Sequence, residues 1–371
     1  MKIINARVLN LHNGNFEEKT LGVHDGKFAA PENENDVFDC QGLFITPGLI
    51  DAHSHLGLWE AGLGVEGADG NEMSDPLTPH LMALDGINPF DTAFQDARSG
   101  GVTTVSTGPG STNIMGGLFT IIKTIGSTVD EMTLCPASAM KWAFGENPKH
   151  YYGANGKMPI TRMSIAGEIR RMLHETQYYM EARKSSSSFV YQEKLEALIP
   201  VLERKIPVKI HAHRADDIAT AIRLGKEFNL RLSLDHCTEG HLIVDAIRAS
   251  GYPVIVGPTF GFQSKVELRN KTFDTPRILA EAGIQVAIMT DHPVHPQSSL
   301  ILWAAMSHKA GLPESEAFRS ITIVPAQILG IDDKVGSIEP GKDADLVFWD
   351  RHPFDLYAQV KKVMINGQFC E

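Results

Sequence analysis

The chain has 371 residues, of which 43% are hydrophobic and 21% are charged. This length suits one large domain with a smaller accessory one, and the composition is ordinary for a globular protein with a large core. A formal charge of −11 argues against general affinity for nucleic acid or for an anionic membrane, since both are bound through basic patches. The four cysteines form no C-x-x-C pair, and no stretch approaches the roughly 20 apolar residues of a membrane span, so we expect reduced thiols and a cytoplasmic protein.

Short strands are predicted at both ends of the chain. Residues 1–30 alternate short apolar runs with turn residues, and the same pattern returns over 344–350 and 360–371. Because a different pattern separates the two ends, we expect one small β-sandwich assembled from residues 1–47 and 339–371.

Between these ends, apolar strands alternate with amphipathic helices. Strands are predicted at 43–53, 102–107, 208–213, 230–236, 253–258 and 286–291, and helices between them at 215–228, 239–250 and 275–283. Such an alternation indicates a parallel sheet covered by helices, and about eight such units fit a (β/α)₈ TIM barrel. We place this barrel at residues 48–338. A doubly wound open sheet is the alternative, but no G-x-G-x-x-G motif follows a strand.

Two segments are longer than ordinary loops, at residues 56–98 and 145–200. Long loops inside a compact domain are usually lids or mobile segments. We expect the second segment to be an insertion over the barrel mouth, with a helical stretch at 162–183 and a flexible, solvated linker at Ser185–Ser188.

Two histidines end the first predicted barrel strand. The run PGLIDAHSH carries His53 and His55, and side chains two residues apart on a strand point to the same face. Both imidazoles can therefore converge on one point, and neutral imidazole suits Zn, Fe, Ni or Mn. An H-x-H pair alone is weak evidence, since structural histidines account for many such pairs.

Further candidates end later strands at the same edge of the sheet. His211 and His213 close VKIHAH, His236 closes LRLSLDH, and Asp291 closes VAIMTD. The spacing from His211 to His236 is about one strand–helix unit, and that from His236 to Asp291 is about two. Because the C-terminal strand ends of a barrel meet over its mouth, we expect these side chains to gather with the first-strand pair around a divalent ion.

These segments together resemble the amidohydrolase superfamily, and most of all its imidazolonepropionase-like and prolidase-like members. The matching runs are PGLIDAHSHL, VKIHAH, LDHCTE, MTDHP and residues 321–350, which resemble the closing signature where the barrel returns to the β-sandwich. The resemblance implies a metal-dependent hydrolase that cleaves the C–N bond of a cyclic amide, an N-acyl amino acid or a dipeptide-like substrate with metal-activated water.

The resemblance also implies a role for each candidate. His53, His55, His211 and Asp291 would bind one or two divalent ions, with zinc favoured and Fe, Mn or Ni also suitable. His236 would be a further ligand, or a close neighbour that polarises the substrate carbonyl. Asp291 would in addition carry a proton from water to the leaving group.

Two ligand positions stay open. The family pattern favours His211 over His213 on the fifth strand, which leaves His213 to contact substrate. On the fourth strand, Lys141 is the favoured candidate for a carboxylated lysine that bridges two ions. Glu146 could take that place instead, or a single ion could bind without a bridge.

Arg214 and His292 are further candidates for binding the substrate. The planar guanidinium of Arg214 could pair with a substrate carboxylate, or equally with Asp216 or Asp217. His292 follows the last predicted metal ligand and could line the pocket.

Two other functions compete with hydrolysis of an amide. A deaminase of an aminated heterocycle would resemble relatives that carry Glu three residues after the fifth-strand histidine, where this chain has Arg214 or Asp216. A non-catalytic scaffold with the same fold would lack ligands, but every expected His and Asp is present. The expected partner is a small-molecule substrate, with neither nucleic acid nor membrane, and a homo-oligomer is left open.

Overall fold

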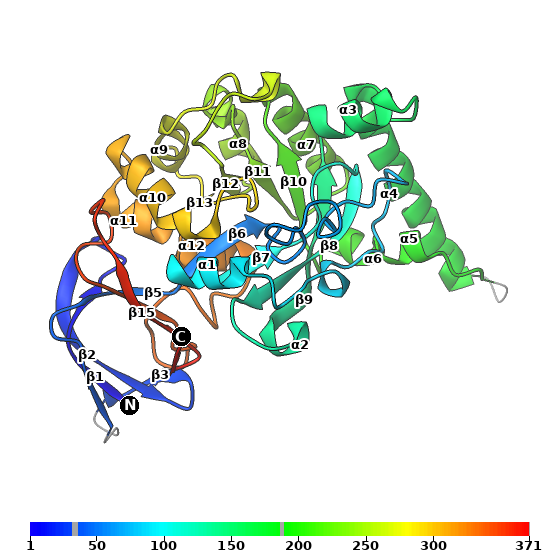
Figure 1. The fold of residues 1–371 in the computed structure, drawn as a ribbon. Helices are drawn as coiled ribbons and strands as arrows, with labels where there is room; N and C mark the ends of the chain where they lie inside the picture. The colour runs from blue at the N-terminus through cyan, green and yellow to red at the C-terminus, as the bar shows by residue number, and fades with distance from the viewer. Residues whose placement is uncertain (32–35, 186–188, 371) are drawn as a thin grey trace.

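The computed structural model describes residues 1–31, 36–185 and 189–370, which form two eight-stranded sheets and the helices around them (Figure 1). One sheet forms a nearly closed barrel, and the other combines strands from both ends of the chain. In the Ser185–Ser188 run, where we predicted a linker, residues 186–188 lie outside the described part. None of the described helices has both the length and the apolar character that crossing a bilayer demands.

The barrel strands follow one another around the sheet in chain order. They are β6 (Leu49–Ser54), β7 (Val102–Thr107), β8 (Met115–Lys123), β9 (Thr133–Ala143), β10 (Val208–Ala212), β11 (Leu232–His236), β12 (Val254–Val256) and β13 (Val286–Ile288). All residues of β6, β7, β10, β11, β12 and β13 are buried, because the sheet is covered on both faces. The predicted barrel is therefore confirmed as a nearly closed eight-stranded sheet within a mixed α/β fold.

The prediction of a wholly parallel barrel is wrong at the third strand. β8 pairs antiparallel with both β7 and β9, with Thr104 opposite Lys123 and Met140 opposite Leu118. A parallel neighbour needs a crossover of a dozen or more residues, whereas only residues 108–114 separate β7 from β8. The chain therefore turns straight back along its neighbour instead of crossing over through a helix.

Helices surround the barrel and follow most of its parallel strands. They are α1 (Ala93–Ser99), α2 (Val129–Met132), α3 (Glu146–Ala154), α4 (Arg162–Ser185), α5 (Glu193–Glu196), α6 (Ile199–Leu202), α7 (Ala215–Glu227), α8 (Val244–Ser250), α9 (Asp274–Glu281), α10 (Leu300–Lys309), α11 (Glu314–Arg319) and α12 (Ile323–Leu329). Apolar residues spaced three and four apart give a helix one buried face, as Ile218, Ala221 and Ile222 do on α7.

The long segment at 145–200 packs mainly against the side of the barrel. Its helix α4 lies next to α5, α6 and α7 and extends away from the barrel at the right of Figure 1. Ile165, Ile169 and Leu173 of α4 share a buried cluster with Trp142 of β9. The expectation of an insertion over the barrel mouth is therefore wrong for α4. This helix lies on the outside of the barrel and serves as the outer helix between β9 and β10.

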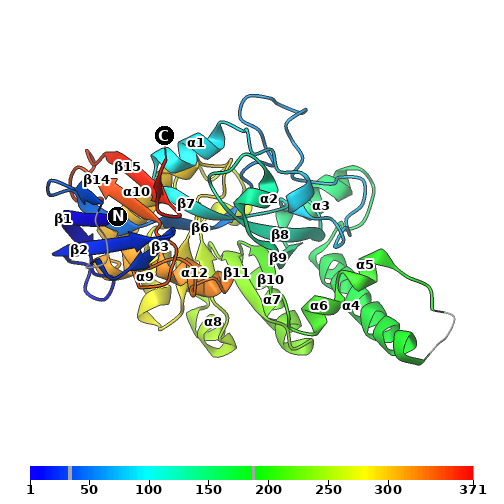
Figure 2. The same cartoon turned by 90° about the horizontal axis from the view of Figure 1, so that it is seen from below.

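The second sheet joins the two ends of the chain. Its strands are β1 (Lys2–Leu9), β2 (Phe16–His24), β3 (Lys27–Ala29), β4 (Val37–Asp39), β5 (Phe44–Pro47), β14 (Leu346–Trp349), β15 (Val360–Ile365) and β16 (Gln368–Phe369). β5 and β14 pair antiparallel and link the N-terminal strands to the C-terminal ones. Figure 2 shows this sheet at one end of the molecule and α4 at the other. Its packing as a sandwich and the domain limits at 47 and 339 stay predictions.

Gly48 divides the predicted strand 43–53 into two strands of different sheets. A Cβ atom at Gly48 would lie 2.1 Å from Oγ1 of Thr103, so only glycine allows the chain to pass from β5 to β6 at this point. This close approach puts β6, and the histidines at its end, against β7.

Candidate metal centre

Five histidines and one aspartate from four barrel strands meet at the C-terminal strand ends. Two groups of three each bring one potential ligand atom per residue to within 4.8 Å of the others; they are His53, His55 and Asp291, and His211, His213 and His236. The imidazole centroids of His53 and His236 are 5.2 Å apart, so the two groups adjoin. All six side chains are buried. Residues scattered over much of the chain thus form one cluster, as their spacing predicted.

Hydrogen bonds on the outer nitrogens set the orientation of three imidazoles. Nδ1 of His55 lies 2.6 Å from the carbonyl oxygen of Gly108, and Nδ1 of His236 lies 2.9 Å from that of Gly257. A carbonyl oxygen only accepts, so Nδ1 carries the proton and Nε2 keeps its lone pair. Nδ1 of His53 lies 2.5 Å from Oδ2 of Asp235. Such partners around a metal site fix the ring and its tautomer.

The inner atoms of the cluster lack hydrogen-bond partners. Nε2 of His211, Nε2 of His236 and Oδ1 of Asp291 are buried without one. Oδ1 of Asp291 lies 3.2 Å from Nε2 of His55. Because the proton of the His55 ring is on Nδ1, two lone pairs face each other here and no hydrogen bond forms. Buried polar atoms are normally paired, and several bare lone pairs around one point call for a cation. Imidazole with one carboxylate is a donor set that fits a divalent metal ion such as Zn²⁺.

Burial keeps four of the cluster histidines uncharged. It lowers the pKa of His53, His211, His213 and His236 well below the ordinary value, and neighbouring positive charges lower it further. Neutral imidazole is the form that binds metals, so these side chains need no deprotonation near neutral pH.

Lys141 lies inside the cluster. Its Nζ is 3.1 Å from Nε2 of His53, and the side chain is fully buried on β9, the fourth barrel strand. Burial lowers the pKa of Lys141 to about 8, which raises the share of uncharged amine. By contrast, Glu146 begins α3 and belongs to neither ligand group. The geometry therefore favours Lys141 over Glu146 as the fourth-strand candidate.

His211 near the end of β10 and His213 just after it differ in their neighbours. Nδ1 of His213 lies 2.7 Å from Oγ1 of Thr238, and its Nε2 lies 3.8 Å from Oε1 of Glu267. Nε2 of His211 has no hydrogen-bond partner. A bare, buried nitrogen is the better metal ligand, so the contacts favour His211.

Three supporting side chains, those of Asp235, Ser233 and Lys209, were not predicted from the sequence. Asp235 receives a hydrogen bond of 2.6 Å from Oγ of Ser233, and its Oδ2 lies 2.9 Å from Nζ of Lys209. Strand alternation was their only signal in the sequence. Lys209 stands two residues before His211, and Ser233 stands two before Asp235, so each pair points to the same face of its strand. These groups hold the carboxylate that in turn holds His53.

A fourth residue that we did not predict, Asp51, ties the first strand to the last. Its Oδ2 accepts hydrogen bonds from the backbone N–H of Thr290 at 3.0 Å, from Oγ1 of Thr290 at 2.6 Å and from Nε2 of Gln297 at 2.7 Å. Thr290 immediately precedes Asp291, so this contact places the carboxylate beside His53 and His55.

Strained backbone also directs two of the ligands. His236, Cys237 and Asp291 have φ angles of 71°, 48° and 57°, a left-handed conformation that non-glycine residues rarely adopt. Such strain costs about 1–3 kcal/mol per residue and is concentrated at functional sites.

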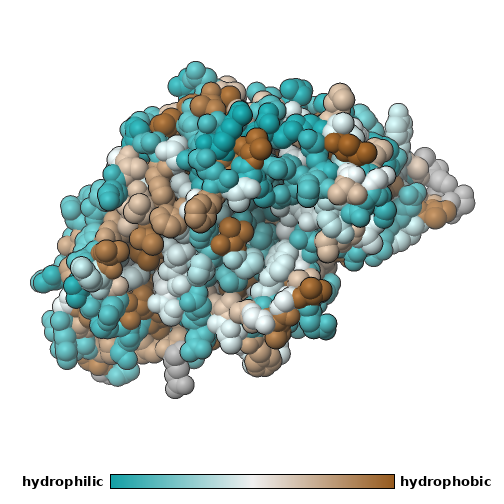
Figure 3. All heavy atoms as spheres, turned by 45° about the horizontal axis from the view of Figure 1, so that its top comes forward, coloured by the Kyte–Doolittle hydropathy of each residue, from teal (hydrophilic) through white to brown (hydrophobic). Residues whose placement is uncertain are grey.

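A cavity of 740 Å³ opens above the cluster. Figure 3 shows the molecule from the side of the barrel mouth, with hydrophobic residues around a hollow. The cavity wall combines cluster side chains with apolar and basic ones; it includes His55, His211, His213, Asp291, Trp59, Phe260, Phe262, Leu268, Val294, Lys265 and Lys271. Among the described residues of this wall, Asp291 is the single carboxylate.

The three predicted substrate contacts have different positions. His213 lines the cavity, whereas Arg214 and His292 do not. Nε and NH2 of Arg214 each donate a 2.9 Å hydrogen bond to Asp216. His292 is buried, and its carbonyl oxygen accepts from the backbone N–H of His55.

Known proteins resemble the chain over nearly its whole length. An amidohydrolase from Thermotoga maritima MSB8 has 42% sequence identity with it and a TM-score of 0.95, covering 99% of this chain and 98% of that one. A prolidase complexed with N-methylphosphonate-L-proline has 18% identity and a TM-score of 0.64, covering 100% and 99%, which shows the fold alone.

Two sequence relatives add to this picture. An imidazolonepropionase from Sphingopyxis alaskensis is 26% identical over 91% of this chain and 87% of its own length. The amidohydrolase tasK of Hapsidospora irregularis is 30% identical over 92% of this chain, which spans only 38% of that relative. The model of the amidohydrolase family matches residues 44–370. The resemblance inferred from the histidine motifs is thereby confirmed: the chain belongs to the amidohydrolase family.

Proposed function

We propose that the chain is a metal-dependent hydrolase that cleaves the C–N bond of an N-acyl amino acid, a dipeptide-like substrate or a cyclic amide. The observation that carries this proposal is the set of bare, buried lone pairs on His211, His236 and Asp291. Family membership and the imidazolonepropionase relative support hydrolysis of a C–N bond.

The ligands would be His53, His55, His211, His236 and Asp291, with Lys141 as the bridging candidate if two ions bind. The donor set favours zinc, although Fe, Mn or Ni would also suit it. When bound, the ion supplies the Lewis acidity that makes water a nucleophile near neutral pH and polarises the scissile carbonyl.

The remaining chemistry rests on side chains of the chain itself. The Asp291 carboxylate faces the cavity and can accept a proton from water and pass it to the leaving nitrogen. His213 also lines the cavity; with the Thr238 hydroxyl donating to its Nδ1, the ring proton lies on Nε2, which can donate to the substrate carbonyl.

The basic wall of the cavity supports a substrate with a carboxylate. Nζ of Lys265 donates to Oδ1 of Asn147 at 2.5 Å, and Nζ of Lys271 donates to the carbonyl oxygen of Phe260 at 2.9 Å. Within the described part of the chain, the Lys271 ammonium therefore has only neutral partners, while the Glu267 carboxylate lies 3.7 Å from Lys265. Trp59, Phe260 and Phe262 provide apolar surface for the acyl part of the substrate.

Metal analysis tests the centre itself. Protein purified without chelator should contain one or two equivalents of a divalent ion, and His211→Asn should lower that content. His174→Asn is the matched control, since His174 is exposed on α4. Equal metal content in both variants would exclude His211 from the site.

A paired substrate screen tests the reaction. N-acyl amino acids and dipeptides should be hydrolysed faster than the same compounds with the carboxylate converted to an amide. Lys271→Gln should raise the KM for the acids and leave that for the amides unchanged. Release of ammonia from aminated heterocycles, without cleavage of any amide, would instead favour the deaminase. A zinc cofactor, a cytoplasmic location and any oligomer stay predictions.

A further inference from the structure

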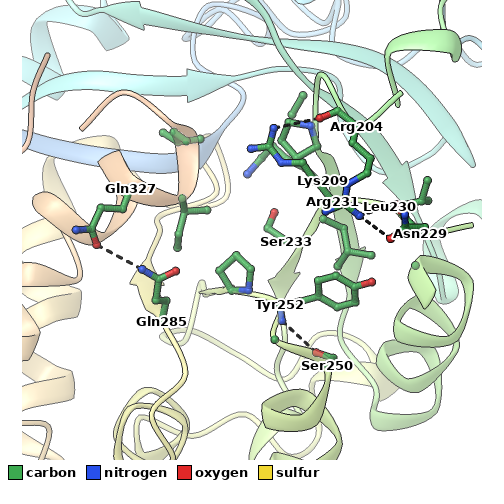
Figure 4. Close-up of a pocket in the computed structure, with 18 of the residues that line it drawn as sticks. Arg204, Lys209, Asn229, Leu230, Arg231, Ser233, Ser250, Tyr252, Gln285 and Gln327 are labelled. Atoms are coloured by element: carbon green, nitrogen blue, oxygen red, sulfur yellow. Dashed lines mark hydrogen bonds between the residues drawn. The ribbon is translucent and has the colours of Figure 1, made fainter. Parts of the chain in front are cut away.

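A second cavity lies at the opposite end of the barrel from the histidines. It has a volume of 580 Å³. Its wall includes the first two residues of β11, the residues that immediately precede β10, β12 and β13, and the C-terminal ends of α7 and α12. Figure 4 shows Arg204, Lys209 and Arg231 on one side of it and Gln285 and Gln327 on the other. In a barrel enzyme, this end normally serves stability, whereas the reaction takes place at the mouth.

The wall of this cavity is basic although the protein is acidic. Arg204, Lys209, Lys226 and Arg231 line it, and none of the described residues in the wall is Asp or Glu. The whole chain has a formal charge of −11. The charge of Lys209 is compensated by Asp235. Arg204, Lys226 and Arg231 therefore supply the positive potential of this concave surface, which attracts small anions.

The two arginines have neutral partners. NH1 of Arg204 donates to the carbonyl oxygen and to Oδ1 of Asn229, each at 2.7 Å. NH1 of Arg231 donates to the carbonyl oxygen of Arg204 at 3.3 Å. In the described part of the chain, neither guanidinium has a carboxylate within 4.0 Å, in contrast to the neighbouring Lys205, which pairs with Glu203. Each guanidinium keeps N–H groups that can bind an oxyanion in a fork.

Other polar groups could bind the remainder of a ligand. Tyr252 lies in the wall of the cavity (Figure 4), and burial raises the pKa of its hydroxyl, so the hydroxyl keeps its proton. The protonated hydroxyl can donate to an anion. Across the cavity, Nε2 of Gln285 donates to Oε1 of Gln327 at 3.4 Å, and this exposed amide pair can exchange that long bond for bonds to a ligand.

We propose that this cavity is a separate binding site for a small organic anion, whose phosphate or carboxylate group Arg204 and Arg231 hold. Lys226 adds charge to the cavity wall, and Tyr252 and the glutamine pair contact the rest of the anion. Lys209 and Ser233 also line the cavity, but they support Asp235 beside His53, so they are left unchanged in the test.

The test is calorimetric titration of the metal-loaded protein at constant ionic strength. Inorganic phosphate and succinate are the two probes, and saturable binding of either one supports the site and assigns the preferred anionic group. The double variant Arg204→Gln/Arg231→Gln should bind that probe at least about tenfold more weakly. Lys205→Gln, which removes a neighbouring charge outside the cavity wall, should bind it as the wild type does.

Two results would overturn the proposal. One is the absence of saturable binding of both probes to the wild-type protein. The other is unchanged affinity in the double variant, because the anion would then occupy another site, such as the histidine cluster. If circular dichroism shows that the double variant does not fold, two single variants, Arg231→Gln and Arg231→Lys, are compared instead. Arg231→Lys keeps the positive charge and should therefore bind the anionic probe more tightly than Arg231→Gln does.

Discussion

Asp235 offers the sharpest test of how the second layer of side chains supports the candidate metal centre. This fully buried carboxylate lies 2.5 Å from Nδ1 of His53, accepts from Ser233 and faces Nζ of Lys209 at 2.9 Å. Asp235→Asn keeps the volume and an oxygen that can accept from His53, but it removes the negative charge. Lys209 would then lose its ion pair and keep the carbonyl oxygen of Ala52 and the face of the Phe119 ring as neutral partners.

Two magnitudes follow from this geometry. Loss of a carboxylate that orients a metal-binding histidine weakens metal binding by about 10- to 100-fold. Loss of one partner of a buried ion pair costs about 3–5 kcal/mol in the free energy of unfolding, because the other charge stays buried without compensation. We therefore expect Asp235→Asn to bind zinc more weakly and to melt at a lower temperature.

Competition with a chromophoric chelator measures the zinc affinity, and circular dichroism measures the melting curve of the metal-free protein. Asp245→Asn is the matched control, since Asp245 is exposed in an ion pair with Arg248 and its loss should have little effect. If Asp235→Asn binds zinc and melts as Asp245→Asn does, the contact with His53 has no orienting role and the reasoning is refuted.

Three further predictions concern the centre and the barrel. Asp291→Asn should lower kcat by about 10²- to 10⁴-fold on a confirmed substrate while the melting curve stays unchanged, and wild-type turnover would exclude Asp291 as the proton carrier. Lys141→Ala should reduce two bound ions to one if the lysine bridges them, whereas an unchanged metal count removes the bridge. Gly48→Ala should lower the free energy of unfolding by about 1–3 kcal/mol through the clash with Thr103, and Thr103→Ala should restore part of it. Gly167→Ala, where no atom beyond the local backbone of its own helix lies within 4 Å of the new Cβ, is the control and should be neutral or slightly stabilising.

The sequence by itself determined the features that depend on local pattern. Alternating apolar strands and amphipathic helices predicted the barrel, because a buried strand and a helix with one apolar face each leave a characteristic periodicity. The end of a strand is also visible in sequence, so the clustering of His53, His211, His236 and Asp291 could be predicted from their spacing alone.

Only the tertiary structure decided the features that depend on distant neighbours. The direction of β8 follows from pairing with β7 and β9, and the split at Gly48 follows from the approach of Thr103. The contact of Asp235 with His53 joins residues far apart in the chain. The family pattern had already favoured His211 over His213, and the structure adds the contacts of His213 with Thr238 and Glu267, which other segments bring to its ring. The cavity lined by Arg204 and Arg231 also depends on the tertiary structure. Its basic wall is built from residues of several chain segments, so no periodic pattern in the sequence reveals it.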